Sequence, residues 1–387
     1  MPVSLLQAAD HGRDHLGCPD PMNTSIGRLL ALAQQIQAIP APSFDEGQRA
    51  QFVRDLFIQE GLLDVSIDAL GNLYGRLVGN GKRGPLIISA HLDTVFPRNV
   101  MRGSSLESDR ILGPGIGDNS LGVASLVALL WILRQRSVTL PGDVWFVANV
   151  CEEGLGDLRG MKAVVDRFRD NVLAYLVLEG TALGHVYHRA VGVQRYRVQI
   201  RTAGGHSLSD FGQPSAIHEA AVLVTRITSL PLPSAPRTTL NVGLMSGGTG
   251  VNVLAAEATF ELDVRSEKPD SLATLVEQVE TLIRSARRDG VGIELEVIGR
   301  RPAGEISVDH PLVRLAGDCL SELGLTASFT SGSTDANVPL SLGYPALVLG
   351  ITTGGGAHTL NEYIDLLPVE AGMEQLVRFV ERVFLLG

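Results

Sequence analysis

The chain has few of the residues that mark small secreted proteins. It contains three cysteines among its 387 residues, Cys18, Cys151 and Cys319, and they are far apart. Disulfide frameworks are built from paired cysteines in short chains, so an odd number at these distances does not fit one. The cysteines indicate a reducing compartment, and we expect a cytoplasmic protein.

A surplus of basic residues is also absent. The chain has 32 Lys and Arg against 42 Asp and Glu, which gives a formal net charge of −10. No run of Lys and Arg interrupts the sequence. Proteins that bind nucleic acid neutralise phosphates with such residues. We therefore expect no nucleic-acid partner.

Signals for membrane insertion or secretion are missing as well. The longest apolar stretch, 121–133, is shorter than the roughly 20 residues that a transmembrane helix needs. The N-terminus has no basic region that leads into an apolar one, as a secretory signal would. We expect no membrane partner. Residues 1–22 show little periodicity, which predicts a loose extension.

The composition that is present suits a large globular core. Hydrophobic residues make up 45% of the chain and charged residues 19%, and the mean hydropathy is +0.18. A chain of this length is long for one core, so two domains are expected.

Short apolar runs alternate with helical patterns along most of the chain. The run 86–90 predicts a strand buried on both faces, as in a parallel sheet covered by helices. The alternation predicts an α/β fold with a mixed sheet flanked by helices. Further strands are expected at 143–150, 174–178, 327–330 and 346–349, and helices at 24–39, 45–60, 120–134, 161–169, 311–323 and 369–386.

Residues 191–302 have a different character. They predict the order strand, helix, strand, strand, helix, strand, which is that of a split βαβ unit with helices on one sheet face. We expect a ferredoxin-like α+β domain inserted into the larger one. The predicted division is a catalytic domain made of residues 1–190 and 303–387, and an inserted domain at 191–302.

Acidic and histidine side chains follow several of the predicted strands. His91 and Asp93 are two residues apart, so they point the same way if the chain stays extended. Glu152 and Glu153 are adjacent at another strand end, and Glu179 ends a third. The carboxyl ends of parallel strands meet at the edge where open α/β sheets bind ligands. Imidazole and carboxylate groups suit divalent metals, although a local turn at His91 and a solvated acidic turn at Glu152 are the simpler alternatives.

A glycine-rich segment precedes the predicted helix at 120–134. Glycines at 113, 115 and 117 between a strand and a helix are similar to a dinucleotide-binding loop. The spacing differs from that fingerprint, and Asp118 stands where the third glycine would be. A carboxylate there would repel a phosphate, so Asp118 is better explained as part of the acidic cluster.

Taken together, nine short segments resemble the M20 family of metallopeptidases and deacylases. They cover nearly the whole chain after residue 25, and the predicted two-part organisation agrees with the family's zinc-exopeptidase-like domain and inserted lid or dimerisation domain. The segments are SAHLDTV (89–95), GPGIGDNSLG (113–122), CEEGLG (151–156), VLEG (177–180), AGGHS (203–207), GVNVL (250–254), LDVR (262–265), STDAN (333–337) and GGGAHTLNEYI (354–364).

The resemblance implies two zinc ions in each subunit, for which Co²⁺ or Mn²⁺ could substitute. His91, Asp118 and Glu179 would hold one ion, and Asp118, Glu153 and His358 the other, so that Asp118 bridges both. Where many relatives have Asp or Lys after this bridging residue, the chain has Asn119 and Ser120. That departure leaves the ligands intact and bears on the substrate class.

The resemblance also implies catalytic and substrate-binding roles. Asp93 would orient the ring of His91, Glu152 would be the general base, and His206 would be an oxyanion donor that in the family usually reaches the neighbouring subunit's site. Three residues would hold the carboxylate end of the substrate, with Arg300 as an alternative to the last of them: Asn252, Arg265 and Arg301.

The expected function is that of a dizinc metallohydrolase that cleaves an amide bond of a small peptide. The STDAN and GGGAH segments favour a peptidase T-like exopeptidase. An N-acyl amino-acid deacylase or desuccinylase of the acetylornithine deacetylase type is the enzymatic alternative, and a catalytically dead binding protein the non-enzymatic one. We expect a homodimer formed through the inserted domain.

Overall fold

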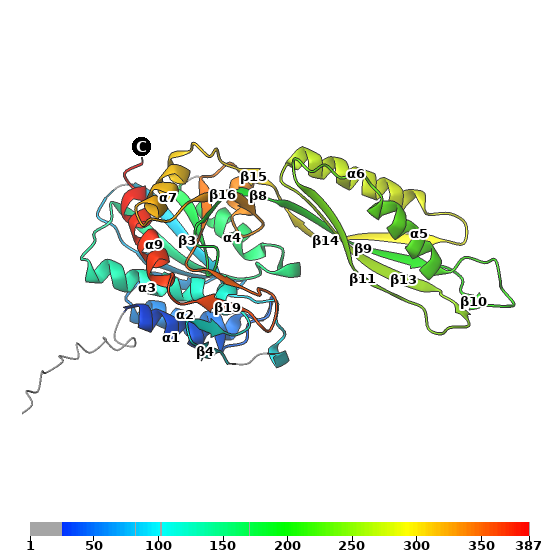
Figure 1. Ribbon diagram of the computed structural model, residues 1–387, viewed down its shortest axis with the longest axis horizontal. Coiled ribbons are helices and arrows are strands. Elements are labelled where there is room, and N and C mark those ends of the chain that lie inside the picture. The colour runs from blue at the N-terminus through cyan, green and yellow to red at the C-terminus, as the bar shows by residue number, and fades with distance from the viewer. Residues whose placement is uncertain (1–24, 82, 101–102, 170, 387) are drawn as a thin grey trace, which may run out of the picture.

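The computed structural model describes residues 25–81, 83–100, 103–169 and 171–386. Figure 1 shows a large body of helices around a sheet and, beside it, an elongated body built from a second sheet with two helices on one face. The elongated body, which we call the inserted segment, comprises residues 192–301. Cys18 and the extension predicted at 1–22 lie outside the described residues.

The large body is organised around a nine-stranded mixed sheet with the order β1-β2-β6-β3-β7-β17-β8-β15, in which β16 also pairs with β8. Strand β3 runs parallel to β6 and β7, and β17 runs parallel to β7. Four central strands therefore end at the same edge. The strands are β1 (Leu63–Ile67), β2 (Leu73–Leu77), β3 (Arg83–His91), β6 (Gly142–Asn149), β7 (Ala174–Glu179), β8 (His185–Ala190), β15 (Gly304–Glu305), β16 (Ser328–Gly332) and β17 (Ala346–Gly350).

Helices cover both faces of this sheet. Along β3, Leu86, Ile88 and Ala90 pack into one hydrophobic cluster, while Ile87 packs into another on the opposite face. This is the burial expected of a central strand in a covered sheet. The first face is covered by α1 (Ser25–Gln37), α2 (Gly47–Gln59), α3 (Leu121–Gln135), α7 (Pro311–Ser321) and α9 (Val369–Val383), and the second by α4 (Arg159–Phe168) and α8 (Asn337–Ser341).

Helix α3 is the central apolar helix of the larger body. A π-helical turn, Ile116–Ser120, precedes it and carries Asp118. Within the described part of the chain, Ile116–Gln135 is the one helix long and apolar enough to cross a bilayer, but 89% of its most apolar window is buried inside the protein. Its hydrophobicity is accounted for by packing against α1 and β3.

Strand β8 and a separate sheet of short strands are among the elements that were not predicted from the sequence. Strand β8 has the sequence HVYHRA, in which two histidines and an arginine interrupt the apolar pattern. A separate four-stranded sheet, β18-β19-β5-β4, holds the loops near the carboxyl edge. Its strands are only two or three residues long: β4 (Ser105–Glu107), β5 (Arg110–Leu112), β18 (Gly354–Gly355) and β19 (Tyr363–Asp365).

The inserted segment follows the order βαββαβ and forms an antiparallel sheet, β11-β13-β9-β14. Helices α5 and α6 cover one face, and their apolar residues join those of the sheet in a hydrophobic cluster of their own. A short pair, β10 (Gly205–His206) with β12 (Val253–Leu254), lies at the far tip (Figure 1). The elements are β9 (Gly192–Arg201), α5 (Ala216–Thr228), β11 (Thr238–Gly247), β13 (Glu257–Ser266), α6 (Pro269–Ser285) and β14 (Gly292–Arg301).

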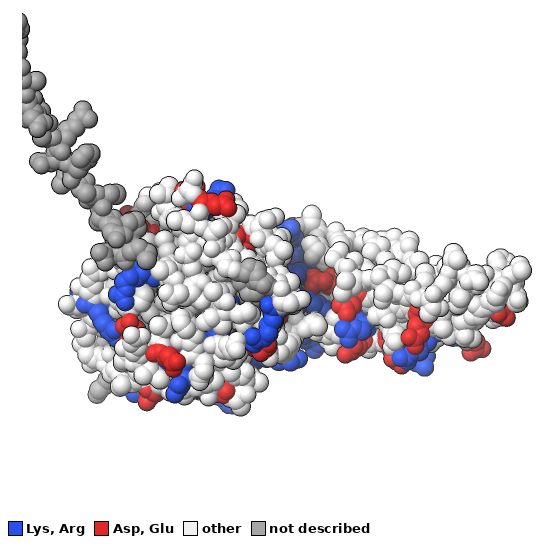
Figure 2. Space-filling view, turned by 90° about the horizontal axis from the view of Figure 1, so that it is seen from below, with Lys and Arg blue, Asp and Glu red and all other residues white. Residues whose placement is uncertain are grey.

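The other face of this sheet is polar. Its side chains form cross-strand ion pairs, such as Arg197 with Glu261 and Glu296, and Arg201 with Glu294. Figure 2 shows basic and acidic side chains side by side in small groups along one edge of the inserted segment. Exposed pairs of this kind contribute about 0–1 kcal/mol each, so they balance charge more than they stabilise the fold.

Candidate metal centre and active site

The predicted metal ligands meet at the carboxyl edge of the large sheet. His91 and Glu179 are the last residues of β3 and β7, and Glu153 lies just after β6. Asp118 comes from the turn before α3, and His358 from the loop between β18 and β19. Residues separated by up to 267 positions in the chain are thereby collected around one point.

Asp118 lies between two groups of ligands. One carboxylate oxygen is 3.0 Å from His91 Nε2 and the other is 3.0 Å from His358 Nε2. His91 Nε2 is also 3.8 Å from Glu179 Oε2, and His358 Nε2 is 3.2 Å from Glu153 Oε1. His91 and Glu179 therefore form one group, and His358 and Glu153 form the other. Asp118 contacts both groups.

The close packing of acids and histidines shifts the pKa values of the predicted ligands. Burial, with the nearby charge of Asp118, raises the pKa of Glu153 to about 7, and burial raises the pKa of Glu179 above its usual value. Hydrogen bonds to Asp118 and Glu153 raise the pKa of His358 to about 10. Burial opposes ionisation of Asp118, but the bonds from His358 and His91 outweigh it and hold its pKa well below the usual range.

This donor set fits a pair of divalent ions. Three carboxylates and two imidazoles match the ligands of zinc and of similar metals. In addition, the donor atoms of His91, Asp118 and Glu153 all lie within 4.8 Å of one another. Two divalent ions would neutralise the repulsion that otherwise raises the carboxyl pKa values. The specific metal and the number of ions remain predictions.

Asp93 contacts both the ring of His91 and the loop that carries Glu152 and Glu153. His91 Nδ1 is 3.0 Å from the Asp93 carbonyl oxygen and 3.6 Å from its carboxylate. The carboxylate accepts hydrogen bonds from Ser43 Oγ at 2.6 Å and from the backbone N–H groups of Glu152 and Glu153 at 2.9 Å each. Asp93 therefore orients the loop that carries Glu152 and Glu153 at least as directly as it orients the ring of His91.

Glu362 was overlooked by the sequence reasoning although it lies in the GGGAHTLNEYI segment. Its buried carboxylate accepts hydrogen bonds from the N–H groups of Gly115, Gly117 and Asp118, at 2.7, 2.8 and 2.8 Å. These bonds shape the turn that presents Asp118. Burial raises the pKa of Glu362 to about 7. Its place four residues after His358 was the available signal.

A cavity of about 400 Å³ opens beside the ligands. Its wall includes Glu152, and the inserted segment contributes three arginines, Arg195, Arg265 and Arg301. Arg265 donates from Nε to Asp263 at 2.6 Å. Arg300, the alternative candidate, does not line the cavity, because its Nε bonds to Gln194 on the opposite face of the sheet.

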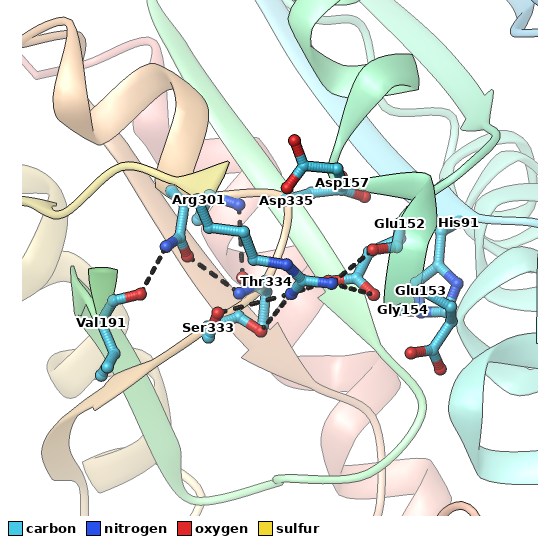
Figure 3. A network of polar contacts seen from close by, with 12 residues as sticks. His91, Glu152, Glu153, Gly154, Asp157, Val191, Arg301, Ser333, Thr334 and Asp335 are labelled. Atoms are coloured by element: carbon cyan, nitrogen blue, oxygen red, sulfur yellow. Dashed lines mark hydrogen bonds and ion pairs between the residues drawn. The ribbon is translucent and has the colours of Figure 1, made fainter. Parts of the chain in front are cut away.

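Glu152 and Arg301 form a buried ion pair at this cavity. Arg301 Nη1 is 2.8 Å from Glu152 Oε1, and the exposed fractions of the two side chains are 6% and 7%. Arg301 also donates to Ser333 (Figure 3). The substrate-binding role predicted for Arg301 stays a prediction, but its guanidinium is already engaged by the predicted general base.

Asp335, in the STDAN segment, was also overlooked. It is fully buried and its Oδ2 accepts a hydrogen bond from Asn149 Nδ2 at 2.6 Å. Burial, with the neighbouring charge of Glu152, raises the pKa of Asp335 to about 7. Asp335, labelled in Figure 3, is therefore a second buried acid close enough to Glu152 to be influenced by its charge.

The structure does not bring His206 and Asn252 to this site. Both are exposed and lie at β10 and β12, at the tip of the inserted segment and far from the large sheet (Figure 1). They lie close to one another, because the Asn252 carbonyl oxygen accepts from the N–H of Ser207 at 3.0 Å. Neither residue lines the cavity of their own chain.

Comparison with known proteins identifies the family of the chain. The pattern of the family described as Peptidase family M20/M25/M40 matches residues 87–384. Carboxypeptidase G2 of Pseudomonas sp. (strain RS-16) is 25% identical over 321 residues, which are 80% of this chain and 76% of that protein. Succinyl-diaminopimelate desuccinylase of Corynebacterium glutamicum is 24% identical over 346 residues, 87% of this chain and 92% of that protein.

Solved structures share the fold. The aminopeptidase PepT of Bacillus cereus ATCC 10987 superposes with a TM-score of 0.75 over 92% of this chain and 98% of that one, at 23% identity. The fold, the ligand cluster and the relatives define a hydrolase of the metallopeptidase and amidohydrolase class. The chain belongs to the M20 peptidase family, whose pattern covers more than half of its residues.

The pKa values predict that metal binding releases protons. Metal ligands must be deprotonated, and without metal His358 holds its proton below a pH of about 10, whereas Glu153 holds its proton below about 7. Titration with Zn²⁺ should therefore release at least one proton per subunit at pH 8 and more at pH 6, with affinity falling as pH falls. Calorimetry in two buffers of different ionisation enthalpy measures this number.

The variant His358→Gln is the control for this titration. It should reduce the protons released at pH 8 by about one, because the histidine proton is no longer displaced. Equal heats in both buffers at pH 6 would show that the ligands are not protonated in the metal-free protein, contrary to the expectation.

Proposed function

We propose that the protein is a two-metal amide hydrolase, with zinc as the first candidate metal, that uses Glu152 as the general base. The observation that carries the proposal is the shared position of Asp118, whose two oxygens face His91 and His358 at 3.0 Å each. When bound, two divalent ions would lower the pKa of a water molecule and polarise the scissile carbonyl group. The described ligands would hold them as two sets joined by Asp118.

The adjacent acids Glu152 and Glu153 would have different roles, one as the general base and the other as a metal ligand. Both acids line the cavity, but Glu153 contacts His358 within the ligand cluster, whereas Glu152 pairs with Arg301. Alternation of side chains along an extended backbone accounts for this opposite orientation. Glu152 would accept a proton from the attacking water and return it to the leaving amine.

The substrate would carry a free carboxylate close to the bond that is cleaved. Arg265 lines the cavity and retains donors beyond those that contact Asp263, and a guanidinium binds a carboxylate through paired N–H groups. Small peptides and N-acyl amino acids both meet this requirement. The peptidase T-like peptidase remains our first candidate and the deacylase our second, which the likeness to the desuccinylase favours.

A substrate panel separates these candidates. We expect hydrolysis of tripeptides with a free C-terminus, slower hydrolysis of dipeptides and N-acyl amino acids, and little of C-terminally amidated tripeptides. Arg265→Gln should raise KM for the free-acid peptide and leave it unchanged for the amidated one. Turnover of N-acyl amino acids alone would favour the deacylase, and no turnover of any substrate by metal-loaded protein would overturn the proposal.

Substitution of the two adjacent acids tests the assignment of the base. Glu152→Gln should retain both metals but lower kcat by roughly 10²–10⁴-fold, because the amide keeps the shape and cannot accept a proton. Glu153→Gln should instead lose metal. Elemental analysis and kcat are measured on both variants, and near-normal kcat in Glu152→Gln would show that the base is another residue.

A homodimer formed through the inserted segment would give His206 and Asn252 a function. Strand β11 is an edge strand of the sheet, and it exposes Leu244 and Met245. An exposed edge strand with apolar side chains pairs readily with another chain. Two-fold pairing there would carry the tip of one subunit toward the cavity of its partner, where His206 would donate to the developing oxyanion.

Mixing two impaired variants tests whether His206 acts in the cavity of the partner subunit. His206→Ala should keep its metal and lower kcat by roughly 10²–10³-fold, the usual loss for one oxyanion donor. Mixed with Glu152→Gln, it should recover activity, because each heterodimer has one site with both groups intact. Exchange is first verified with differently tagged chains. No recovery after proven exchange, or a fully active monomer by light scattering, would refute the shared site.

A further inference from the structure

We infer that Arg301 is a positioning residue through which the inserted segment holds Glu152 in place. The inference rests on the proposed role of Glu152 as general base. Arg301 ends β14, the last strand of the inserted segment, and its side chain enters the catalytic cavity of the larger body. It would thus act through Glu152 and would not bind the substrate itself.

The contacts of Arg301 converge on one residue. Nη1 is 2.8 Å from Glu152 Oε1, and Nη2 is 3.5 Å from Oε2. Nη2 also donates to the carbonyl oxygen of Glu152, so the side chain and the backbone of the base are held together. Nη1 further contacts the carbonyl oxygen of Ser333 at 3.1 Å and its Oγ at 3.4 Å. Figure 3 shows the guanidinium between Ser333 and Glu152.

These contacts argue against a role in substrate binding. Both terminal nitrogens of Arg301 are engaged, and the remaining Nε is buried without a partner, where no substrate oxygen can reach it. Separating a buried ion pair leaves two uncompensated charges and is strongly unfavourable. A substrate carboxylate would have to displace Glu152 to bind here, and it would remove the base from its place in doing so.

Neighbouring contacts hold the same loop. Arg195 on β9 donates to the Gly154 carbonyl oxygen at 2.6 Å, and the backbone N–H of Arg300 on β14 donates to Asp157 at 2.7 Å. The loop 152–157 is thereby attached to the inserted segment at three points. On its other side, Asp93 accepts from its backbone, so the base is fixed between the two bodies.

The sheet register links this contact to the predicted substrate site. Arg265 on β13 and Arg301 on β14 both pair with Val193 of β9, so they belong to one cross-strand row. Side chains in such a row point to the same face, here the face without helices. One rigid row would therefore hold both the carboxylate-binding arginine and the base, and this kind of fixed geometry favours reaction.

Substitution of Arg301 tests the inference, with Arg300 as the matched control. Arg301→Met should lower kcat by about 10–100-fold, because a small displacement of a reacting group can cost a factor of this size. KM should change less than about threefold, and the metal content should stay constant. Arg301→Lys should be intermediate, because an ammonium keeps the charge but not the paired contact. Arg300→Met should match the wild type, because the backbone N–H that bonds Asp157 is retained and only a side chain that points away from the cavity is changed.

Hydrogen exchange of the metal-loaded, full-length protein supplies a measurement that does not depend on turnover. Backbone amides of residues 152–157 should exchange at least about tenfold faster in Arg301→Met than in Arg300→Met. If Arg301→Met fails to fold, Arg301→Lys gives the same comparison at smaller amplitude.

The outcomes separate the two proposals. If the wild-type protein hydrolyses no substrate, the proposed function fails and the exchange comparison alone decides whether Arg301 holds the loop. A raised KM at constant kcat would assign Arg301 to the substrate and overturn the inference. Unchanged kcat would overturn it too, as would equal exchange in the two methionine variants.

Discussion

The repulsion among buried and partly buried carboxylates at one edge of the large sheet is the constraint around which the rest of the site is arranged. Asp118, Glu153 and Glu179 lie close together, and burial raises the pKa values of the latter two. Like charges in a dry environment persist only if counter-charges or hydrogen bonds compensate them. The histidines on either side of Asp118 supply part of that compensation, and bound divalent ions would supply the remainder.

The hydrogen bonds and the ion pair around the predicted ligands also compensate the charges of acidic side chains. Glu362 uses its carboxylate to shape the turn that carries Asp118, and Asp93 does so for the loop of Glu152 and Glu153. Arg301 compensates the charge of Glu152 directly. Glu362, Asp93 and Glu152 are thus each matched to donors that also fix the geometry of the site. Charge compensation and geometry are provided by the same side chains.

Much of the larger body could be predicted because its signals are local. The apolar run before His91 indicates a central strand, and the structure buries alternate residues of that strand in two clusters. The acids at the ends of β6 and β7 follow from the same logic, because parallel strands end together. By contrast, β8 has a mixed sequence, and its place in the sheet comes from its pairing with β16 and β17.

The sequence by itself determined where the central strands lie along the chain, which acids and histidines follow them, and the family. Each of these depends on short segments. The tertiary structure alone decided which atoms meet. It turned Arg301 toward Glu152, assigned Glu362 to the Asp118 turn, and left His206 at the tip of the inserted segment. The contacts of Arg301 and Glu362 join residues more than a hundred positions apart, and only the tertiary packing of the chain brings such residues together.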